Sequence, residues 1–144
     1  MKKIVNFREL EDDLIILRMD YFFDRQISYF IYLKETNEYI GYCDLRLYHN
    51  PELYYYGNIG YRIEPAFRGN NYARRAALML IDLARDFGMK KLIVTCNPEN
   101  EASRKTIEAI RARYIKTVRV PFWHPLFPEE RKKMIYQIDL EKKE

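Results

Sequence analysis

The segment from Ile59 to Ala76 constrains this chain most, because it predicts a strand, a tight turn and a helix in immediate succession. Apolar residues alternate with others up to Ile63, the polar stretch Arg68–Asn71 contains a glycine, and helical spacing of apolar residues follows. A helix start presents unpaired backbone N–H groups and the positive end of the macrodipole, and a glycine lets the backbone approach an anion. The segment therefore predicts a site for a pyrophosphate group.

Two nucleotide-binding turns do not fit this segment. A dinucleotide fold requires G-x-G-x-x-G after the first strand of a parallel sheet, whereas this turn has the single glycine Gly69 and follows antiparallel strands. A Walker turn requires Gly-Lys-Ser/Thr, and the chain contains no such triplet. Both nucleotide-binding readings are therefore excluded.

The sequence before the turn predicts three strands joined by short polar turns, over residues 28–35, 39–48 and 54–64. In the second, Cys43 and Leu45 fall on one face and Asp44 and Arg46 on the other. Short connections between consecutive strands predict an antiparallel meander. The first 27 residues are less regular: residues 3–7 fit a strand, and residues 14–19 fit either a strand or a short helix.

The sequence after the turn predicts a helix over residues 72–87 with Gly88 as its C-terminal cap. The apolar run at residues 91–96 predicts a strand buried on both faces, parallel to the strand before the helix. A second helix over residues 101–112, with Asn100 as its N-cap, precedes strands at 113–120 and 133–140. We therefore predict one α/β (α+β) domain over residues 1–144, with helices flanking a mixed, twisted sheet of about 6–7 strands.

Composition narrows the class of protein further. The chain has 144 residues and a net charge of +4, and its lysine pairs are dispersed, a pattern that favours solvated faces over a nucleic-acid surface. No apolar run of membrane-spanning length and no signal peptide are found, so we expect a cytoplasmic protein with no membrane partner. We expect reduced core thiols at Cys43 and Cys96 and no metal site, since His49 and His124 are isolated. The many aromatic residues are compatible with a homodimer.

The residues around the turn resemble the GNAT superfamily of acyl-CoA-dependent N-acetyltransferases. Residues 68–73, Arg-Gly-Asn-Asn-Tyr-Ala, are similar to the family's pyrophosphate loop, Q/R-x-x-G-x-G/A. Residues 60–65 resemble the strand that leads into that loop, and residues 97–103 the strand end and helix start that follow it. The predicted order of elements over residues 40–140 is also the family's order.

The resemblance implies direct transfer of an acetyl group from acetyl-CoA to a primary amine, in an opening where the third meander strand splays away from its neighbour. The backbone N–H of Ile63 would face the thioester oxygen, and Asn100 and Arg104 would contact the pantetheine arm and the adenosine phosphate. Arg68 would add positive charge to a pyrophosphate site made by five backbone N–H groups, those of Gly69, Asn70, Asn71, Tyr72 and Ala73.

The chain departs from the family pattern at four positions. Asn71 replaces the usual second glycine, which asparagine can do because it tolerates a left-handed backbone. Arg111 replaces a glycine that commonly ends the second helix. Ile107 stands where many members have the tyrosine that protonates the leaving thiolate. Asn58 lies about where many relatives have a glutamate, and an amide cannot accept a proton as that carboxylate does.

The remaining candidates for catalysis are Glu64, a base acting through water or an exposed strand-end residue, and Tyr61, a hydroxyl donor or a core side chain. Asp44 and Tyr42 could face the acceptor, but the sequence does not assign their side. The Pro-rich loop at residues 121–128 fits a lid, a contact surface or plain packing. Two other functions stay open: a non-catalytic acyl-CoA binding or sensing module, and a basic RNA- or ribosome-associated protein. The acceptor, small molecule or protein, cannot be read from the sequence.

Overall fold

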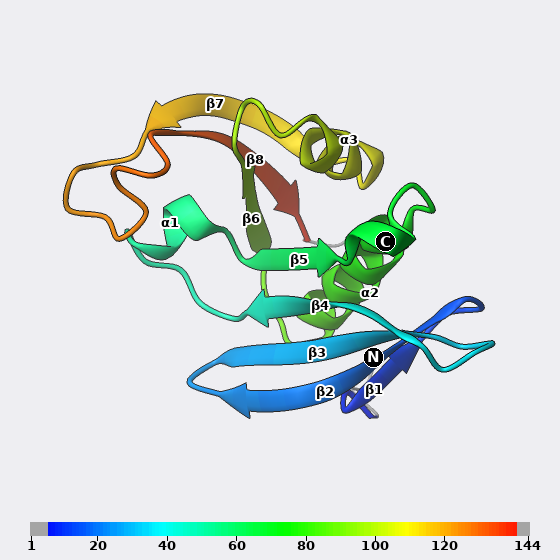
Figure 1. Cartoon of the computed structure of the whole chain (residues 1–144). Helices are drawn as coiled ribbons and strands as arrows, with labels where there is room; N and C mark the ends of the chain where they lie inside the picture. Colours follow the sequence, from blue (N-terminus) through cyan, green and yellow to red (C-terminus); the bar gives the residue numbers. More distant parts are fainter. Residues whose placement is uncertain (1–5, 141–144) are drawn as a thin grey trace.

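The structure, a computed structural model, describes residues 6–140, which form two antiparallel sheets and the helices that cover them (Figure 1). The first sheet has five strands in chain order, each antiparallel to the next. These strands are β1 (Glu9–Glu11), β2 (Ile15–Phe23), β3 (Gln26–Leu33), β4 (Tyr39–Arg46) and β5 (Ile59–Ile63). The predicted antiparallel meander is thus confirmed, and it extends further toward the N-terminus than expected.

The N-terminal region resolves one of the open alternatives. Residues 14–19 fall largely in β2, a strand, which pairs with both β1 and β3. The strand suggested for residues 3–7 falls mostly outside the described residues, and Phe7, which is described, lies in a turn. The two strands added here raise the total in the described residues to eight, above the expected 6–7.

Alternation within β3 and β4 decides which face of the first sheet is buried. Ile27, Tyr29 and Ile31 of β3 are fully buried, as are Cys43 and Leu45 of β4. This face packs on α2 (Tyr72–Asp86), which lies behind β4 and β5 in Figure 1. The predicted division of β4 into an apolar and a polar face is therefore confirmed.

The strand expected over residues 54–64 is wrong in its first half. The chain forms the short helix α1 (Leu53–Tyr56), and only Ile59–Ile63 are extended, as β5. The side-chain Oδ1 of Asn50 accepts the N–H of Leu53 at 2.7 Å and so starts the helix, and Gly57, at φ +85°, ends it. These local contacts override the strand preference of the three consecutive tyrosines.

After β5, the short 3-10 turn η1 (Pro65–Phe67) leads into α2, and the elements that follow match the predicted order. Helix α3 ends at Ala109, three residues earlier than predicted, and the other boundaries differ by two residues at most. The second sheet has the strand order β6-β8-β7. These elements are β6 (Lys91–Cys96), α3 (Glu101–Ala109), β7 (Arg113–Arg119) and β8 (Lys132–Asp139).

The prediction of one continuous mixed sheet requires a correction. In the described residues no ladder joins β5 to β6, so each is an edge strand of its own sheet. They are linked at one end, where the backbone N–H of Asn58 donates to the carbonyl of Ile93 at 2.6 Å. Beyond this link no ladder pairs the two strands, so every second residue of β5, including Ile63, keeps its backbone groups on the open side. The α+β class with helices flanking twisted sheets is confirmed.

Candidate cofactor and active site

The turn before α2 has the left-handed backbone that an anion-binding loop requires. Gly69 adopts φ +89° and Asn71 adopts φ +65°, and α2 begins at the next residue, Tyr72. An added Cβ on Gly69 would meet no atom within 4 Å, so the loop surface is open at this point. The prediction that asparagine can replace the usual glycine at position 71 is therefore confirmed.

The backbone of Ile63 faces away from β4. The carbonyl oxygen of Arg62 points at Gly41 of β4, where an added Cβ would lie 2.1 Å from it. Because a trans peptide directs its C=O and N–H oppositely, the N–H of Ile63 points away from β4. The N–H of Glu64 donates to the carbonyl of Ile40 in the same way, so the carbonyl of Ile63 also faces outward. Both backbone groups of Ile63 thus point to the open side of β5.

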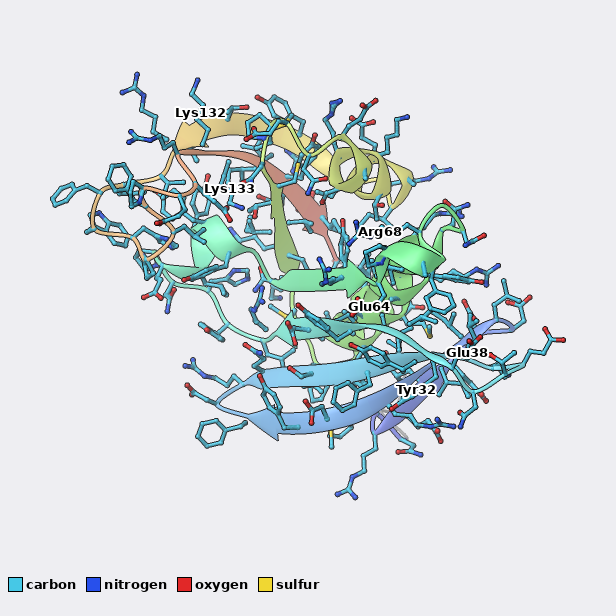
Figure 2. The ribbon with its side chains drawn as sticks, in the orientation of Figure 1. Tyr32, Glu38, Glu64, Arg68, Lys132 and Lys133 are labelled. Atoms are coloured by element: carbon cyan, nitrogen blue, oxygen red, sulfur yellow. The ribbon has the colours of Figure 1, made fainter. Side chains whose placement is uncertain are left out.

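Arg68 is attached to this same strand end. Its Nε donates to the carbonyl oxygen of Ile63 at 2.7 Å, and the residue is otherwise exposed (Figure 2). Asn70, next in the loop, donates its Nδ2 to the carbonyl of Phe67 at 3.1 Å. These contacts fix the loop against the end of β5 and place one guanidinium group beside it.

The start of α3 approaches β5 from the helical side of the sheet. Asn100 caps α3, since its Oδ1 accepts the N–H of Ser103 at 3.1 Å, as predicted. The hydroxyl groups of Ser103 and Tyr61 lie 3.2 Å apart, which joins the first turn of α3 to β5 two residues before Ile63. Arg104 follows, half-buried, on the same turn. The helix start, the Tyr61 hydroxyl and the Ile63 backbone therefore belong to one region.

Tyr61 is mostly buried, and burial raises the pKa of its hydroxyl above the ordinary value, although the hydrogen bond with Ser103 partly opposes this. The hydroxyl is therefore protonated at neutral pH. Ile107, at the position of the usual family tyrosine, is fully buried and carries no proton to give. Ser103 is a residue that the sequence analysis missed as a partner of Tyr61, and nothing in the pattern paired these two positions.

Asn58 serves as a structural link. It is fully buried, its Nδ2 donates to the carbonyls of Arg46 and Tyr48 at 2.9 and 2.8 Å, and its Oδ1 accepts the N–H of Ile93 at 2.8 Å. Every polar atom of the side chain has a partner. This arrangement agrees with the expectation that Asn58 does not act as a base.

The outer face of the first sheet carries the remaining candidates. Tyr42, Asp44 and Glu64 lie on this face, opposite the helices, which assigns the side that the sequence left open. Arg46 spans Gly60, where an added Cβ would lie 3.1 Å from its guanidinium, and its Nη1 donates to the carbonyl of Gly57. Glu64 is half-buried near Tyr39. The arrangement over Gly60 was missed, although a glycine inside a strand is a signal of close approach.

The Pro-rich loop is ordered by His124. This buried side chain lies 2.8 Å from the carbonyl of Glu52 through Nε2, and its ring contacts those of Tyr55 and Tyr56 in α1. Trp123 packs edge-on against Tyr55 but stays half exposed. The loop therefore packs on α1, and its roles as a lid or a contact surface stay predictions.

Two hollows of the described surface lie away from the cofactor loop. One, of about 680 Å³, lies between the second half of α2, the end of α3 and β8, and the other, of about 350 Å³, lies beside His49 and Asn58. Within the described residues, no group of three or more His, Cys, Asp or Glu side chains could hold a metal ion. No helix described here is both long and apolar enough to cross a membrane.

Comparison with known proteins tests the resemblance that the loop suggested. The family model described as an acetyltransferase (GNAT) domain matches residues 9–113. The chain belongs to the GNAT family of acetyltransferases. The match covers the meander, the turn at residues 68–71 and both long helices, and so includes the candidate cofactor-binding and catalytic residues but not the Pro-rich loop. A search of curated proteins finds no match.

Solved structures support the same GNAT fold. An acetyltransferase of this family from Bacillus anthracis has a TM-score of 0.74 at 16% identity, covering 93% of this chain and 99% of that one. An acetyltransferase from Agrobacterium tumefaciens has a TM-score of 0.71 at 18% identity, covering 96% and 98%. The microcin C7 self-immunity acetyltransferase MccE, solved with acetyl-CoA and AMP, has a TM-score of 0.64 at 19% identity, covering 81% and 62%. At these identities the likeness establishes the fold.

Proposed function

We propose that this protein transfers an acetyl group from acetyl-CoA to a primary amine. The observation that carries the proposal is the left-handed turn at Gly69 and Asn71, placed at the start of α2 beside the outward-facing backbone of Ile63. A helix start with free N–H groups suits a pyrophosphate, and an edge-strand N–H suits a thioester oxygen that gains negative charge. The MccE structure, which holds acetyl-CoA on the same fold, supports this choice of cosubstrate.

The cofactor would lie in the opening between β5 and β6, beside the start of α3. The backbone N–H groups of residues 69–73 would hold the pyrophosphate, with the Arg68 guanidinium beside them. Asn100 and Arg104, on the first turn of α3, would contact the pantetheine arm and the adenosine phosphate. The Ile63 N–H would polarise the thioester carbonyl, which makes the carbon more open to attack by the amine.

The thiolate released by this attack needs a proton. Tyr61 can supply one, because its buried hydroxyl stays protonated at neutral pH and lies two residues from Ile63. The proton would be replaced through the Ser103 hydroxyl, 3.2 Å away. On the outer face, Glu64 would accept a proton from the incoming ammonium through a water molecule, since Asn58 cannot.

A second function is favoured by a specific observation. Ile107 and Asn58, at the positions where relatives have a tyrosine and a glutamate, are both buried and fully occupied by structural contacts. The chain would then bind acyl-CoA without turnover and act as a sensing module. Such a protein binds the cofactor and releases no thiol with any amine.

Calorimetric titration of acetyl-CoA into the wild-type protein and two glycine variants tests the proposal. Gly69 and Gly88 both adopt φ +89°, and a Cβ on either meets no atom within 4 Å, so glutamate strains both backbones alike. Only Gly69→Glu places a carboxylate in the pyrophosphate site. We expect Gly69→Glu to weaken binding at least about tenfold, a loss of about 1.4 kcal/mol, and Gly88→Glu to bind like the wild type.

An amine panel monitored for thiol release then separates the two functions. Turnover with any amine supports the transferase, and binding without turnover supports the sensing module. Equal losses in Gly69→Glu and Gly88→Glu would overturn the assignment of the loop. No binding by the wild-type protein would overturn both functions.

A further inference from the structure

The strand β7 forms an exposed edge of the second sheet. It pairs with β8 on one side, and in the described residues no strand pairs with its other side. Six of its seven residues are exposed, among them Tyr114 and Ile115 at 50% and 37%. In Figure 1 it lies along the outer margin of the molecule, away from β5 and α2. An edge of this kind presents a row of free main-chain groups.

The hydrogen-bonding register shows which groups face outward. The N–H of Val120 donates to the carbonyl of Arg131, at the end of β8, at 2.9 Å. Because N–H directions alternate along a strand, the N–H groups of Arg119 and Thr117 both point away from β8, toward the free edge. The pair Arg119 and Lys132 is then a non-hydrogen-bonded pair, the type in which opposite side chains lie closer together.

This close pair has the same charge. Arg119 and Lys132 are directly opposite, both are exposed, and neither has an ion-pair partner among the described residues. Like charges in this arrangement destabilise a sheet. Figure 2 labels Lys132 at the start of β8, beside Lys133, whose ammonium is instead buried against Glu130. The repulsion between Arg119 and Lys132 is left uncompensated within the part of the chain that the structure describes.

Positive charge continues along the edge. Lys116 is exposed and lacks an ion-pair partner in the described structure, and Arg113 forms an exposed pair with Asp139 at 3.1 Å. The strand contains no acidic residue. Pairing of β7 with a second copy of itself would bring these cations together, so the charge disfavours self-association and favours an anionic partner.

We propose that β7 is a docking edge for an extended acidic segment of another protein, which adds as a strand beside it. Main-chain hydrogen bonds to β7 would give affinity, and carboxylates on one face of the added strand would neutralise Arg119 and Lys132, which share a face of the sheet. Tyr114 and Ile115 supply apolar contacts that suit a polypeptide. This interaction is independent of acetyl transfer, because it uses no residue of the proposed cofactor site.

The test measures fluorescence anisotropy of a labelled peptide of alternating glutamate and valine. We expect the wild-type protein to bind this peptide and not to bind the matching peptide of alternating lysine and valine. Arg119→Glu and Lys132→Glu should each weaken binding about tenfold, since each replaces an attraction by a repulsion. Equal binding of both peptides, or no binding of the acidic one, would overturn the proposal.

Two further measurements separate strand addition from simple charge attraction. Thr117→Pro removes the outward N–H of an edge position, where proline is tolerated, and should abolish binding, whereas Thr117→Val keeps the N–H and should bind normally. A second measurement leaves the protein unchanged and uses two acidic peptides, one N-methylated at the odd-numbered residues and the other at the even-numbered residues. Only the peptide whose methylated N–H groups face β7 should lose binding. Retained binding of both N-methylated peptides would show charge attraction without strand pairing and would overturn the proposal. Tighter binding of a single-stranded RNA that survives Thr117→Pro would assign the edge to phosphate and would also overturn it.

Discussion

Asn58 and Ile93 connect the two sheets through a reciprocal pair of hydrogen bonds. The backbone N–H of Asn58 donates to the Ile93 carbonyl at 2.6 Å, and the Ile93 N–H donates to the Asn58 side-chain Oδ1 at 2.8 Å. The amide nitrogen of the same side chain donates to the carbonyls of Arg46 and Tyr48. One buried residue thus holds the end of β4, the start of β5 and the middle of β6 together. The opening proposed for acetyl-CoA begins where this connection ends.

Replacing Asn58 by aspartate should destabilise the protein strongly. The carboxylate keeps the shape of the amide but directs an oxygen at the carbonyls of Arg46 and Tyr48, so two donated bonds become repulsive contacts. A buried group left without its partner costs about 1–3 kcal/mol, and more when it is charged. We expect a loss of about 3 kcal/mol or more in the free energy of unfolding, measured by urea denaturation.

The exposed Asn6 provides the matched control, since Asn6→Asp makes the same chemical change outside the core. Its stability should stay within about 0.5 kcal/mol of the wild type. Similar losses in the two variants would contradict the role assigned to Asn58. In Asn58→Ala, where no charge is buried, the folded fraction should bind acetyl-CoA more weakly, because the separation of β5 and β6 is less defined.

Replacing Tyr61 by phenylalanine tests the proposed proton donor. Tyr61→Phe removes one hydroxyl and keeps the packing, so the KM for acetyl-CoA should change little while kcat falls about 10²-fold. The matched control is Tyr29→Phe, which removes a buried hydroxyl that donates to the carbonyl of Phe7 in the core. That variant should lose stability and keep its kcat. A normal kcat in Tyr61→Phe would show that the thiolate obtains its proton elsewhere.

The pH dependence of the reaction follows from the same residue. Burial raises the pKa of Tyr61, so the hydroxyl stays protonated through neutral pH and beyond the ordinary tyrosine value of about 10. A proton donor of this kind loses its proton only above that value. We therefore expect no decline of kcat due to Tyr61 between about pH 7 and pH 9. A fall in kcat over this range that disappears in Tyr61→Phe would contradict the assignment.

Much of the fold could be predicted because local patterns and contacts agree in it. The spacing of apolar residues in α2 reflects one buried face, and Asn71 and Gly88 adopt the left-handed conformations expected at its two ends. The left-handed turn proposed to bind the cofactor was predictable for the same reason, since its conformation depends on residues within a few positions of Gly69. Such features need no information about distant parts of the chain.

The features that the sequence did not predict depend on distant partners. Tyr54, Tyr55 and Tyr56 favour a strand by composition, but a cap from Asn50 and the contact with His124, far along the chain, make them helical. The separation of β5 from β6 depends on where hydrogen bonds stop beyond Asn58. The free edge at β7 likewise follows from strand order, which local periodicity does not contain.

Asp12 should stabilise the protein at neutral pH and lose this effect in acid. Burial alone would raise the pKa of its carboxyl. The N–H groups of Ile15 and Leu14 and the Arg75 guanidinium at 2.8 Å lower the pKa by more than burial raises it, so the net shift is downward. A carboxyl whose pKa is lower in the folded state stabilises the protein at pH values above the pKa of the unfolded state, about 3.9. The contribution is lost as pH falls from there through the folded pKa.

The variant Asp12→Asn measures this contribution. The free energy of unfolding should be lower than that of the wild type by a constant amount above about pH 5, and the difference should shrink as pH falls below about 4. Asp13→Asn is the control, because Asp13 pairs with the same Arg75 at 2.9 Å but its side chain is 84% exposed. A difference for Asp12→Asn that grows in acid would reverse the predicted sign.

Replacing Arg111 by glycine should stabilise the protein. Arg111 has φ +68° just after α3, and two bonds close the helix end there: its own N–H donates to the Glu108 carbonyl at 3.0 Å, and the Ala112 N–H donates to the Ile107 carbonyl at 3.3 Å. This is the Schellman pattern, in which glycine is preferred because a side chain strains a left-handed backbone. Relief of that strain, about 1–2 kcal/mol, exceeds the added entropy cost of glycine, about 0.5–1 kcal/mol.

Lys105→Gly, in the right-handed interior of α3, should instead destabilise by about 1 kcal/mol. Urea unfolding should therefore shift in opposite directions for the two variants, and a shift in the same direction would show that Arg111 is held by contacts other than this turn.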